Sequence, residues 1–473
     1  MPVLYFSKNQ YVFKFLNLEK EFKGSIDWNF QGYGKLWNYN LQYLDFLKQG
    51  DIPTYLKITL VSNLYQNLWE GRLILEPYPA SLRIMNMIRF LLKLGPDDNT
   101  LILKTYLLAE VNYLSKNLEY HILANHLLEN AFALLMGGYF FNQKKWIEGA
   151  EKLLTSELEE QILKDGAHFE LSPMYHQIIL FRVLEALAYL PKENKLSQFL
   201  RNKAELMLSW LNAFSFRDGS IAHFNDSCDG IALDTLELLK IGNELGIKPK
   251  KTHQLKESGY RKFDIHDFEL IADVNGISPF YQPGHSHADT FSFCLHYEGN
   301  PIIVDPGIST YEISPRRDWE RSTKAHNTLV INGINSAEVW AGFRVGKRLK
   351  VEIIEENKDF VQAIHDGYRK QKVKVSRKFD ITNGIIEIID FLEFEALFPM
   401  ANIYFHFHPS IDINQIGESV FQISNVLRIE FIGDSKIELS EYKYCLGYNS
   451  YCKAKKIKVT LLGNSLKTTI IKI

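Results

Sequence analysis

The periodicity of apolar residues changes once along this chain of 473 residues, and the change divides the chain into two parts. From about residue 35 to residue 250, apolar residues recur every three or four positions, which places them on one face of an α-helix. Beyond about residue 262 they alternate with polar residues or form β-branched runs, the pattern of short strands. The sequence therefore predicts a helical domain over residues 1–250 and an antiparallel β-sandwich over residues 251–473.

Helix start and stop signals, together with runs of apolar residues at helical spacing, predict about eight helices in the first part. Asp51 and Pro53 are typical of one helix start, and Ser81 predicts another start whose helix ends near Gly95. Six further helices are expected over residues 100–118, 126–141, 145–163, 173–190, 195–213 and 232–245. Antiparallel helices in this number, without a short repeat signature, favour an α/α toroid or an irregular helical array. The segment is short for a complete toroid, so we expect an incomplete one.

Turn signals separate many short strands in the second part. Asn383-Gly384 lies between two alternating runs and predicts a two-residue hairpin, and Glu298-Gly299-Asn300-Pro301 marks another turn. Strands are expected over residues 267–274, 290–298, 301–305, 327–332, 349–356, 359–365, 371–381, 384–394, 401–408, 427–432 and 457–472. Many short strands joined by turns are typical of an antiparallel sandwich.

The composition excludes several classes of protein. The chain is 46% hydrophobic and 23% charged, as soluble globular proteins are and disordered chains are not. Its 54 basic and 56 acidic residues give a formal net charge of -2, so no global positive field attracts nucleic acid. The 4 cysteines are too few and too scattered for a disulfide framework or a cysteine-based zinc site. An acidic ligand must therefore be bound by local groups in a cleft.

The sequence shows neither an export signal nor a membrane span. Its apolar start is interrupted at Lys8, before a signal-peptide core would be complete, and no later apolar stretch has the length of a transmembrane helix. We therefore expect a cytoplasmic protein, or a periplasmic one if an export segment is missing from this sequence. The oligomeric state is not predicted.

The densest group of chemistry-bearing residues is Gly284-His285-Ser286-His287-Ala288-Asp289. If this segment is extended, His285 and His287 leave the same face of the strand. Asp305 ends an apolar run, and His326 precedes another strand. Imidazole and carboxylate groups from separate strands can close a divalent-metal site, and zinc prefers such donors. The alternative is a polar cluster at strand ends that holds no metal.

Two polar segments interrupt the helical half. Asn125 and His126 lie in an otherwise apolar helix, where they either tie helices together or donate hydrogen bonds to a carboxylate. Ser172 before a proline predicts a helix start that places Tyr175 and His176 in the first turn. Adjacent Tyr and His side chains at such a corner are either packing residues or a proton-transfer pair.

In this order, the segments resemble the heparinase II/III-type polysaccharide lyases, including related alginate lyases. The matching motifs are Asn-His at 125–126, Ser-Pro-Met-Tyr-His at 172–176, Gly-His-Ser-His-Ala-Asp at 284–289, Val-Asp-Pro-Gly at 304–307 and Ala-His-Asn-Thr at 325–328. The resemblance implies an α/α toroid followed by an antiparallel β-sandwich, with a polysaccharide groove between them. It also implies β-elimination at a uronic acid of an acidic polysaccharide or oligosaccharide.

The resemblance further implies roles in proton transfer. Asn125 and His126 would neutralise the substrate carboxylate as the C5 proton leaves. Tyr175 is the first candidate for acid or base, and we expect it to face His285 across one cavity. The other candidates for proton transfer are His285, Tyr311 and His176.

Binding roles follow in the same way. A structural divalent ion such as Zn²⁺, which the elimination itself does not require, would be held by His287, Asp305 and His326. The candidates for binding the acid groups or sugar rings of the substrate are Arg83, Trp340 and Arg344. Arginines in ion pairs and aromatic residues in cores are the ordinary alternative for these three positions.

Two other functions remain open. A hydrolase on the same scaffold would need a pair of carboxylates across the groove, for which Glu76, Glu170 and Asp226 are available. A catalytically silent protein that binds polysaccharide, linked to the biosynthesis of a surface polysaccharide, would need neither arrangement.

Overall fold

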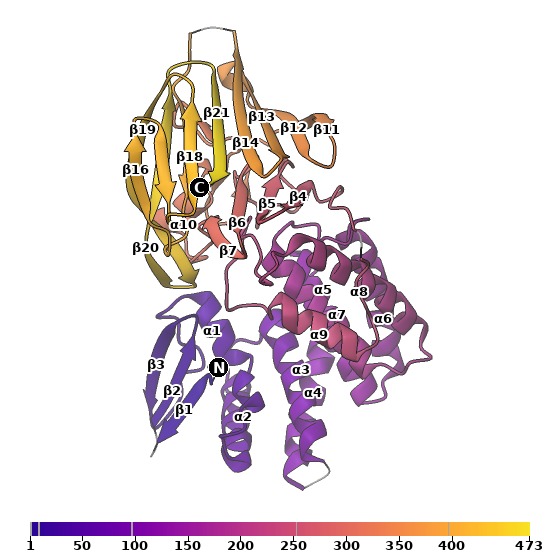
Figure 1. The fold of residues 1–473 in the computed structure, drawn as a ribbon. Helices are drawn as coiled ribbons and strands as arrows, with labels where there is room; N and C mark the ends of the chain where they lie inside the picture. Colours follow the sequence, from indigo (N-terminus) through magenta and orange to yellow (C-terminus); the bar gives the residue numbers. More distant parts are fainter. Residues whose placement is uncertain (1, 8–9, 96–97, 252, 396) are drawn as a thin grey trace. The chain divides into compact units, whose positions relative to one another are not determined.

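The computed structural model describes residues 2–7, 10–95, 98–251, 253–395 and 397–473. A helical region is followed by antiparallel sheets, as the periodicity predicts (Figure 1). The chain forms two compact units, residues 1–161 with 182–202, and residues 162–181 with 203–473. The start of one helix of the helical half thus belongs to the unit that contains the large sheets. A domain boundary at residue 250 stays a prediction.

The first unit is mainly helical. It contains α1 (Lys35–Gln42), η1 (Asp45–Lys48), α2 (Thr54–Trp69), α3 (Pro77–Leu94), α4 (Asp98–Leu114), α5 (Ala124–Phe140), α6 (Lys144–Gln161) and parts of α7 (Pro173–Tyr189) and α8 (Lys195–Phe214). The predicted helix start at Ser81 is wrong, because the prolines at 77 and 79 occupy the first turn and Ser81 Oγ donates to the Pro77 carbonyl inside the helix. The predicted end is confirmed, since Gly95 follows α3 with a φ of 74°.

A small sheet at the N-terminus was not predicted. It comprises β1 (Leu4–Ser7), β2 (Gln10–Phe15) and β3 (Leu18–Lys23), paired in that order. The signal was present in the alternation of β2, which buries Phe13 and Phe15, and in Asn17, which adopts a positive φ in the turn to β3. Phe13 packs edge to face on Trp28 and Phe46, so the sheet belongs to the core of the first unit.

The second unit holds the remaining strands and two further helices. These elements are α9 (Thr235–Glu244), β4 (Tyr260–Ile265), β5 (Phe268–Asp273), β6 (Phe293–Tyr297), β7 (Asn300–Ile303), α10 (Pro315–Glu320), β8 (Leu329–Ile331), β9 (Val339–Trp340), β10 (Arg344–Val345), β11 (Val351–Glu356), β12 (Phe360–Tyr368), β13 (Val373–Thr382), β14 (Ile385–Phe394), β15 (Ala401–His406), β16 (Ile413–Gly417), β17 (Val420–Ile423), β18 (Leu427–Ile432), β19 (Ser435–Gly447), β20 (Ser450–Leu461) and β21 (Ser465–Lys472). The run expected as one strand over 457–472 is two strands, because the polar turn after Leu461 breaks it.

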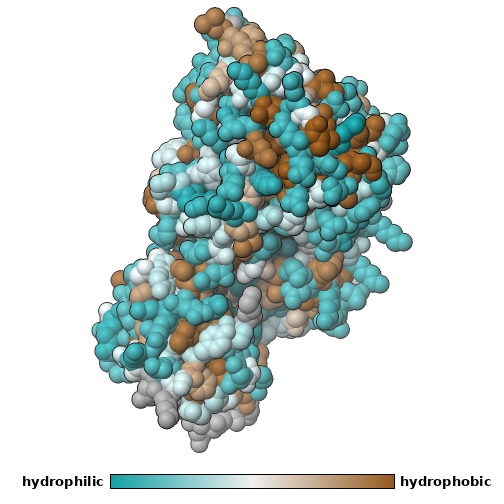
Figure 2. Space-filling model, turned by 60° about the vertical axis from the view of Figure 1, so that its left-hand side comes forward, coloured by the Kyte–Doolittle hydropathy of each residue, from teal (hydrophilic) through white to brown (hydrophobic). Residues whose placement is uncertain are grey.

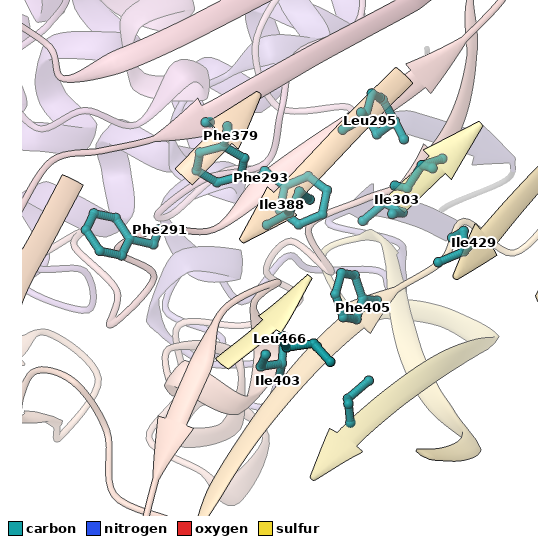
Figure 3. Packing of buried hydrophobic residues seen from close by; sticks show 14 of the residues in the cluster. Phe291, Phe293, Leu295, Ile303, Phe379, Ile388, Ile403, Phe405, Ile429 and Leu466 are labelled. Carbon is teal, nitrogen blue, oxygen red and sulfur yellow. The ribbon is translucent and has the colours of Figure 1, made fainter. Parts of the chain in front are cut away.

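The large sheets form a sandwich. One layer has the order β11-β12-β13-β14-β21-β18-β17-β16, and the other combines the sheets β19-β20-β15-β8 and β4-β5-β6-β7. Side chains of all three sheets meet in one apolar cluster that includes Phe293, Phe379, Ile388 and Phe405 (Figure 3). The predicted hairpin is confirmed, since Asn383 and Gly384 join β13 to β14 with positive φ angles.

On the face shown in Figure 2, hydrophobic residues lie in small groups among hydrophilic ones. None of the helices among the described residues has the length and apolarity needed to cross a membrane.

Candidate active site

The start of α7 is fixed to the loop that carries Asp226. Ser172 caps the helix as predicted, because its Oγ accepts a hydrogen bond of 3.2 Å from the Tyr175 backbone N–H. The same Oγ donates to the Asp226 carbonyl at 2.7 Å and lies 3.0 Å from Ser227 Oγ. All these residues belong to the second unit. The loop therefore sets where Tyr175 lies.

Tyr175 faces His285, as expected. The two ring centroids lie 4.1 Å apart with the planes tilted by 33°. The Tyr175 hydroxyl lies 3.1 Å from the hydroxyl of Tyr311, whose own ring is 5.9 Å from that of His285. Tyr175 is 8% exposed, so it is largely shielded from solvent. Three of the four residues proposed for proton transfer thus meet in one place.

Asp226 is the centre of this arrangement. Its Oδ2 lies 2.7 Å from His285 Nδ1, and its Oδ1 lies 2.8 Å from His287 Nε2. Arg317, from α10, donates to both oxygens, at 2.5 Å to Oδ1 and 2.7 Å to Oδ2. Asp226 and Arg317 are fully buried. The carboxylate therefore orients both histidines and is itself held by a bidentate guanidinium.

The charge of Asp226 fixes the proton on each histidine. Burial alone would raise the pKa of Asp226, but the Arg317 charge and the hydrogen bonds from His285, His287 and Arg317 hold this pKa well below its usual range. An ionised carboxylate only accepts hydrogen bonds, so neutral His285 carries its proton on Nδ1. Its Nε2 is then the basic atom, and it lies 4.0 Å from Oε1 of buried Glu170.

His176 does not join the site, which corrects its predicted role in proton transfer. It is 1% exposed, and its ring packs against that of Trp210 with centroids 4.4 Å apart and planes tilted by 41°. Its Nδ1 accepts from the His168 N–H at 3.2 Å, and its Nε2 lies 3.1 Å from the Met207 carbonyl. Both ring nitrogens are therefore used inside the core, and His176 is a packing residue.

This burial predicts a pH dependence of stability. Burial lowers the pKa of His176 to about 3, whereas an unfolded histidine titrates near 6.5. Below pH 6.5 the unfolded chain binds a proton that the folded chain does not, so the free energy of unfolding falls by about 1.4 kcal/mol per pH unit from this group. Urea unfolding between pH 7 and pH 5 should show a smaller loss of stability in His176→Gln than in wild type. The exposed His266→Gln is the control, and an unchanged slope in His176→Gln would refute the assignment.

The predicted metal ligands lie close together but are not assembled around a common point. Among the residues that the structure describes, no three His, Cys, Asp or Glu side chains are arranged as a metal site. His326 Nδ1 lies 2.7 Å from Asp305 Oδ2, and the rings of His287 and His326 are 5.3 Å apart. The Nδ1 atom of His287 and the Nε2 atom of His326 are buried and lack a hydrogen-bond partner among the described residues.

The first unit holds the two residues predicted to neutralise a carboxylate. Asn125 and His126 lie in the first turn of α5, and Asn125 is buried. His126 Nδ1 is 3.2 Å from Glu119 Oε1, and its ring lies 4.1 Å from that of Tyr78. One ring nitrogen of His126 therefore already has a carboxylate partner in the first unit.

Arg83 is buried in an ion pair and not presented to a ligand, which corrects a second prediction. Its side chain is 0% exposed and forms an ion pair with Glu110, and its Nη1 donates to the Gln42 carbonyl at 2.9 Å. The positive charge is therefore satisfied inside the first unit, as in the ion-paired alternative.

Trp340 and Arg344 are available to a ligand. They pair across the short hairpin of β9 and β10, and both side chains are exposed, Trp340 by 49%. Phe343, in the turn of this hairpin, lies 5.8 Å from His285 and 5.2 Å from Tyr311 between ring centroids. The hairpin therefore adjoins the tyrosine–histidine pair.

Sequence reasoning missed Asp226 and Arg317 as site residues. Asp226 was considered only as a hydrolase carboxylate, and Arg317 was not considered. The one local signal is the polar run Asn225-Asp226-Ser227 after the apolar Phe224. All four of these residues are buried, which is unusual for polar side chains without a functional or structural role.

The helical region and the β-sandwich have the architecture of heparinase III. A solved structure of heparinase III aligns with a TM-score of 0.74 at 16% identity, covering 95% of this chain and 80% of that one. A mutant of heparan sulfate lyase from Pedobacter heparinus aligns with a TM-score of 0.66 at 16% identity, covering 96% and 80%. These structural likenesses concern the fold.

The chain belongs to the heparinase II/III family. The model of the heparinase II/III N-terminus matches residues 81–240, and the model of the heparinase II/III-like C-terminal part matches residues 247–471. The heparin-sulfate lyase of Bacteroides stercoris is 26% identical over 247 residues, which are 46% of this chain and 37% of that protein. The heparin-sulfate lyase of Bacteroides thetaiotaomicron is 25% identical over 313 residues, 54% and 43% respectively. The matched region is thus less than half the length of these relatives.

Proposed function

We propose that this protein cleaves an acidic, uronate-containing polysaccharide by β-elimination. The observation that carries the proposal is the contact of Tyr175 with a His285 whose tautomer is set by the buried Asp226. Family membership supports the same reaction, since the curated relatives are heparin-sulfate lyases. Heparan sulfate is therefore the first polymer to test.

The geometry supports one division of the proton transfers. His285 Nε2 is the basic atom and takes the proton from C5 of the uronate, after which the imidazolium is stabilised by Asp226. The Tyr175 hydroxyl gives its proton to the leaving O4, and Tyr311 positions this hydroxyl through the 3.1 Å contact. The C4–O4 bond breaks as the C4–C5 double bond forms, so no water is consumed.

The negative charge that builds on the uronate carboxylate requires donors. We keep Asn125 and His126 in this role on the basis of the resemblance, because an amide and an imidazole can donate to a carboxylate. Replacing an oxyanion donor costs about 10²–10³ in turnover in other enzymes.

The hydrolase alternative is disfavoured by the environment of its carboxylates. Burial would raise the pKa of Asp226, but Arg317 and the two histidines lower it, so this carboxylate cannot serve as the general acid of a glycosidase. Glu76 forms an ion pair of 2.8 Å with Lys35 in the first unit. A binding protein without activity would bind the polysaccharide but show no turnover.

A panel of uronate polymers distinguishes the three functions. Purified protein is incubated with heparan sulfate, alginate and other polyuronates, and near-UV absorbance and reducing ends are followed. New absorbance identifies a lyase, reducing ends without absorbance identify a hydrolase, and binding without either product identifies a silent protein.

We also propose that His287, Asp305 and His326 hold a divalent ion such as Zn²⁺ with a structural role. The donor types suit zinc, and a metal would satisfy the two buried nitrogens that lack partners. When bound, the ion would fasten the loop that carries His287 to the segment between η2 (Thr323–Ala325) and β8. No step of the elimination depends on it.

Metal analysis tests this proposal independently of activity. We expect one equivalent of metal in the purified protein, its loss in His287→Ala, and a lower melting temperature after chelation. The control is His365→Ala, which removes a buried histidine elsewhere in the second unit. Metal-free protein whose melting temperature is unaffected by added zinc would contradict the proposal.

A further inference from the structure

Two buried arginines hold the β9–β10 hairpin beside the site. Arg317 lies in α10, and Arg321 is the C-cap residue of that helix. Arg317, which binds Asp226, also donates to the Gly342 carbonyl at 3.0 Å. Arg321 donates to the Ser286 carbonyl at 2.8 Å and to the carbonyls of Trp340 and Arg344 at 3.4 and 3.3 Å. The hairpin and His285 are therefore fixed to one another within the second unit.

This rigid hairpin presents an aromatic surface. The Trp340 indole lies against the backbone of Gly346, where a Cβ would come within 3.0 Å of its Cζ3. A hollow of about 400 Å³ opens beside it, lined by Ile334, Asn335, Ala337, Glu338, Val339 and Trp340. An exposed aromatic ring held at the edge of a hollow suits the apolar face of a sugar ring.

Basic residues lie in β10 and in the segment that follows it. Arg344 is exposed, and none of the carboxylates in the described residues pairs with it. The Arg348 guanidinium lies 4.8 Å from the Phe280 ring, and its Nη1 has no hydrogen-bond partner among the described residues. Arg369 donates to the Arg348 carbonyl at 2.9 Å, so its guanidinium lies beside the backbone of Arg348.

Positive charge exceeds negative charge around these arginines. Burial, followed by the charges of Arg369 and Lys370, lowers the pKa of Lys347. The nearby carboxylates are Glu338, 3.5 Å from Lys370, and Asp366, 3.4 Å from Arg369. The cations here are Arg344, Lys347, Arg348, Arg369 and Lys370. Guanidinium groups match carboxylate and sulfate groups in bidentate geometry.

We infer that Trp340, Arg344 and Arg348 form a strip that binds a further acidic sugar unit, beyond the pair of sugars that is cleaved. This inference rests on the proposed function, because it takes the acidic polysaccharide as the ligand. Trp340 supports the ring of that unit, and the two arginines bind its carboxylate or sulfate groups. Longer oligosaccharides therefore bind more tightly than the shortest cleavable one.

Binding to a protein that cannot turn over tests the strip. Calorimetry with Tyr175→Phe protein measures Kd for heparan sulfate tetrasaccharide and octasaccharide at low and high salt. We expect the octasaccharide to bind about tenfold more tightly than the tetrasaccharide. The double variant Arg344→Gln with Arg348→Gln should weaken octasaccharide binding about three- to tenfold at low salt and less at high salt. Trp340→Ala weakens it by about tenfold at both salt concentrations, because stacking is not screened.

Arg428→Gln is the matched control, since it removes an exposed arginine from β18, which four strands separate from β11 in the same sheet. The inference is wrong if the control, the double variant and Trp340→Ala all bind the octasaccharide with equal affinity. This holds even if the wild type proves to be a lyase. Loss of binding in the strip variants together with a wild type that forms no unsaturated ends would retain the strip and reject the proposed function.

Discussion

Replacing Tyr175 with Phe is expected to reduce the rate of elimination by about 10²–10⁴-fold, because positioned proton transfer contributes that much to catalysis. The hydroxyl is the only group removed, and it contacts the Tyr311 hydroxyl at 3.1 Å. The ring contact with His285 at 4.1 Å remains, so the shape of the site is kept. The initial rate of near-UV absorbance change on a responsive polymer measures the effect.

Two companion variants make this result specific. Tyr368→Phe removes a buried hydroxyl that donates to the Leu329 carbonyl at 2.9 Å, and it should keep full turnover with a small loss of stability. Tyr311→Phe should lower kcat less than Tyr175→Phe and leave KM little changed, since Tyr311 acts through Tyr175. Retained turnover in Tyr175→Phe would remove Tyr175 from the proton transfer.

Replacing Asp226 with Asn is expected to abolish turnover by a different route. An amide cannot accept hydrogen bonds from two histidines and Arg317 at once, so His285 can no longer be held with its proton on Nδ1. In serine proteases the comparable loss of the preferred histidine tautomer costs about 10⁴-fold. Nitrogen NMR of His285 should show the change of tautomer, which a purely structural role for Asp226 would not produce.

The loss of stability in this variant needs a control. Breaking a buried ion pair typically costs about 3–5 kcal/mol, because the other charge is left unpaired. Asp390 and Arg377 form a second fully buried pair in the same unit, with contacts of 2.7 and 2.9 Å. Asp390→Asn should lose comparable stability yet keep its turnover per folded molecule. Equal turnover loss in both variants would show that Asp226 acts through the fold alone.

The arrangement of secondary structure was largely predictable because apolar periodicity is a local property. The change of period marked helices before strands, and Asn383-Gly384 fixed the β13–β14 hairpin. The sheet of β1, β2 and β3 was missed although β2 alternates, because each of its strands has only four to six residues. Helix α3 was misplaced by four residues, since a proline-rich start was read as preceding the helix.

Site residues that belong to a recognisable sequence motif were predictable. Site residues that are brought together only by the tertiary fold were not. Tyr175 and His285 follow from the resemblance, and their contact joins segments 110 positions apart. Asp226 and Arg317 are separated by 91 residues and belong to no motif used here. Arg83 and His176 show the opposite error, because burial decides their role and burial at a single position cannot be read from residue type.

The fate of solvent oxygen tests the central claim most directly. Wild-type protein is incubated with a responsive uronate polymer in water enriched in heavy oxygen, and the product ends are analysed by mass spectrometry and proton NMR. We expect no heavy oxygen in the products, a new end unit lighter by one water, and a vinyl proton at its C4. Saturated non-reducing ends, with one heavy oxygen at the new reducing end for each bond broken, would contradict elimination by Tyr175 and His285.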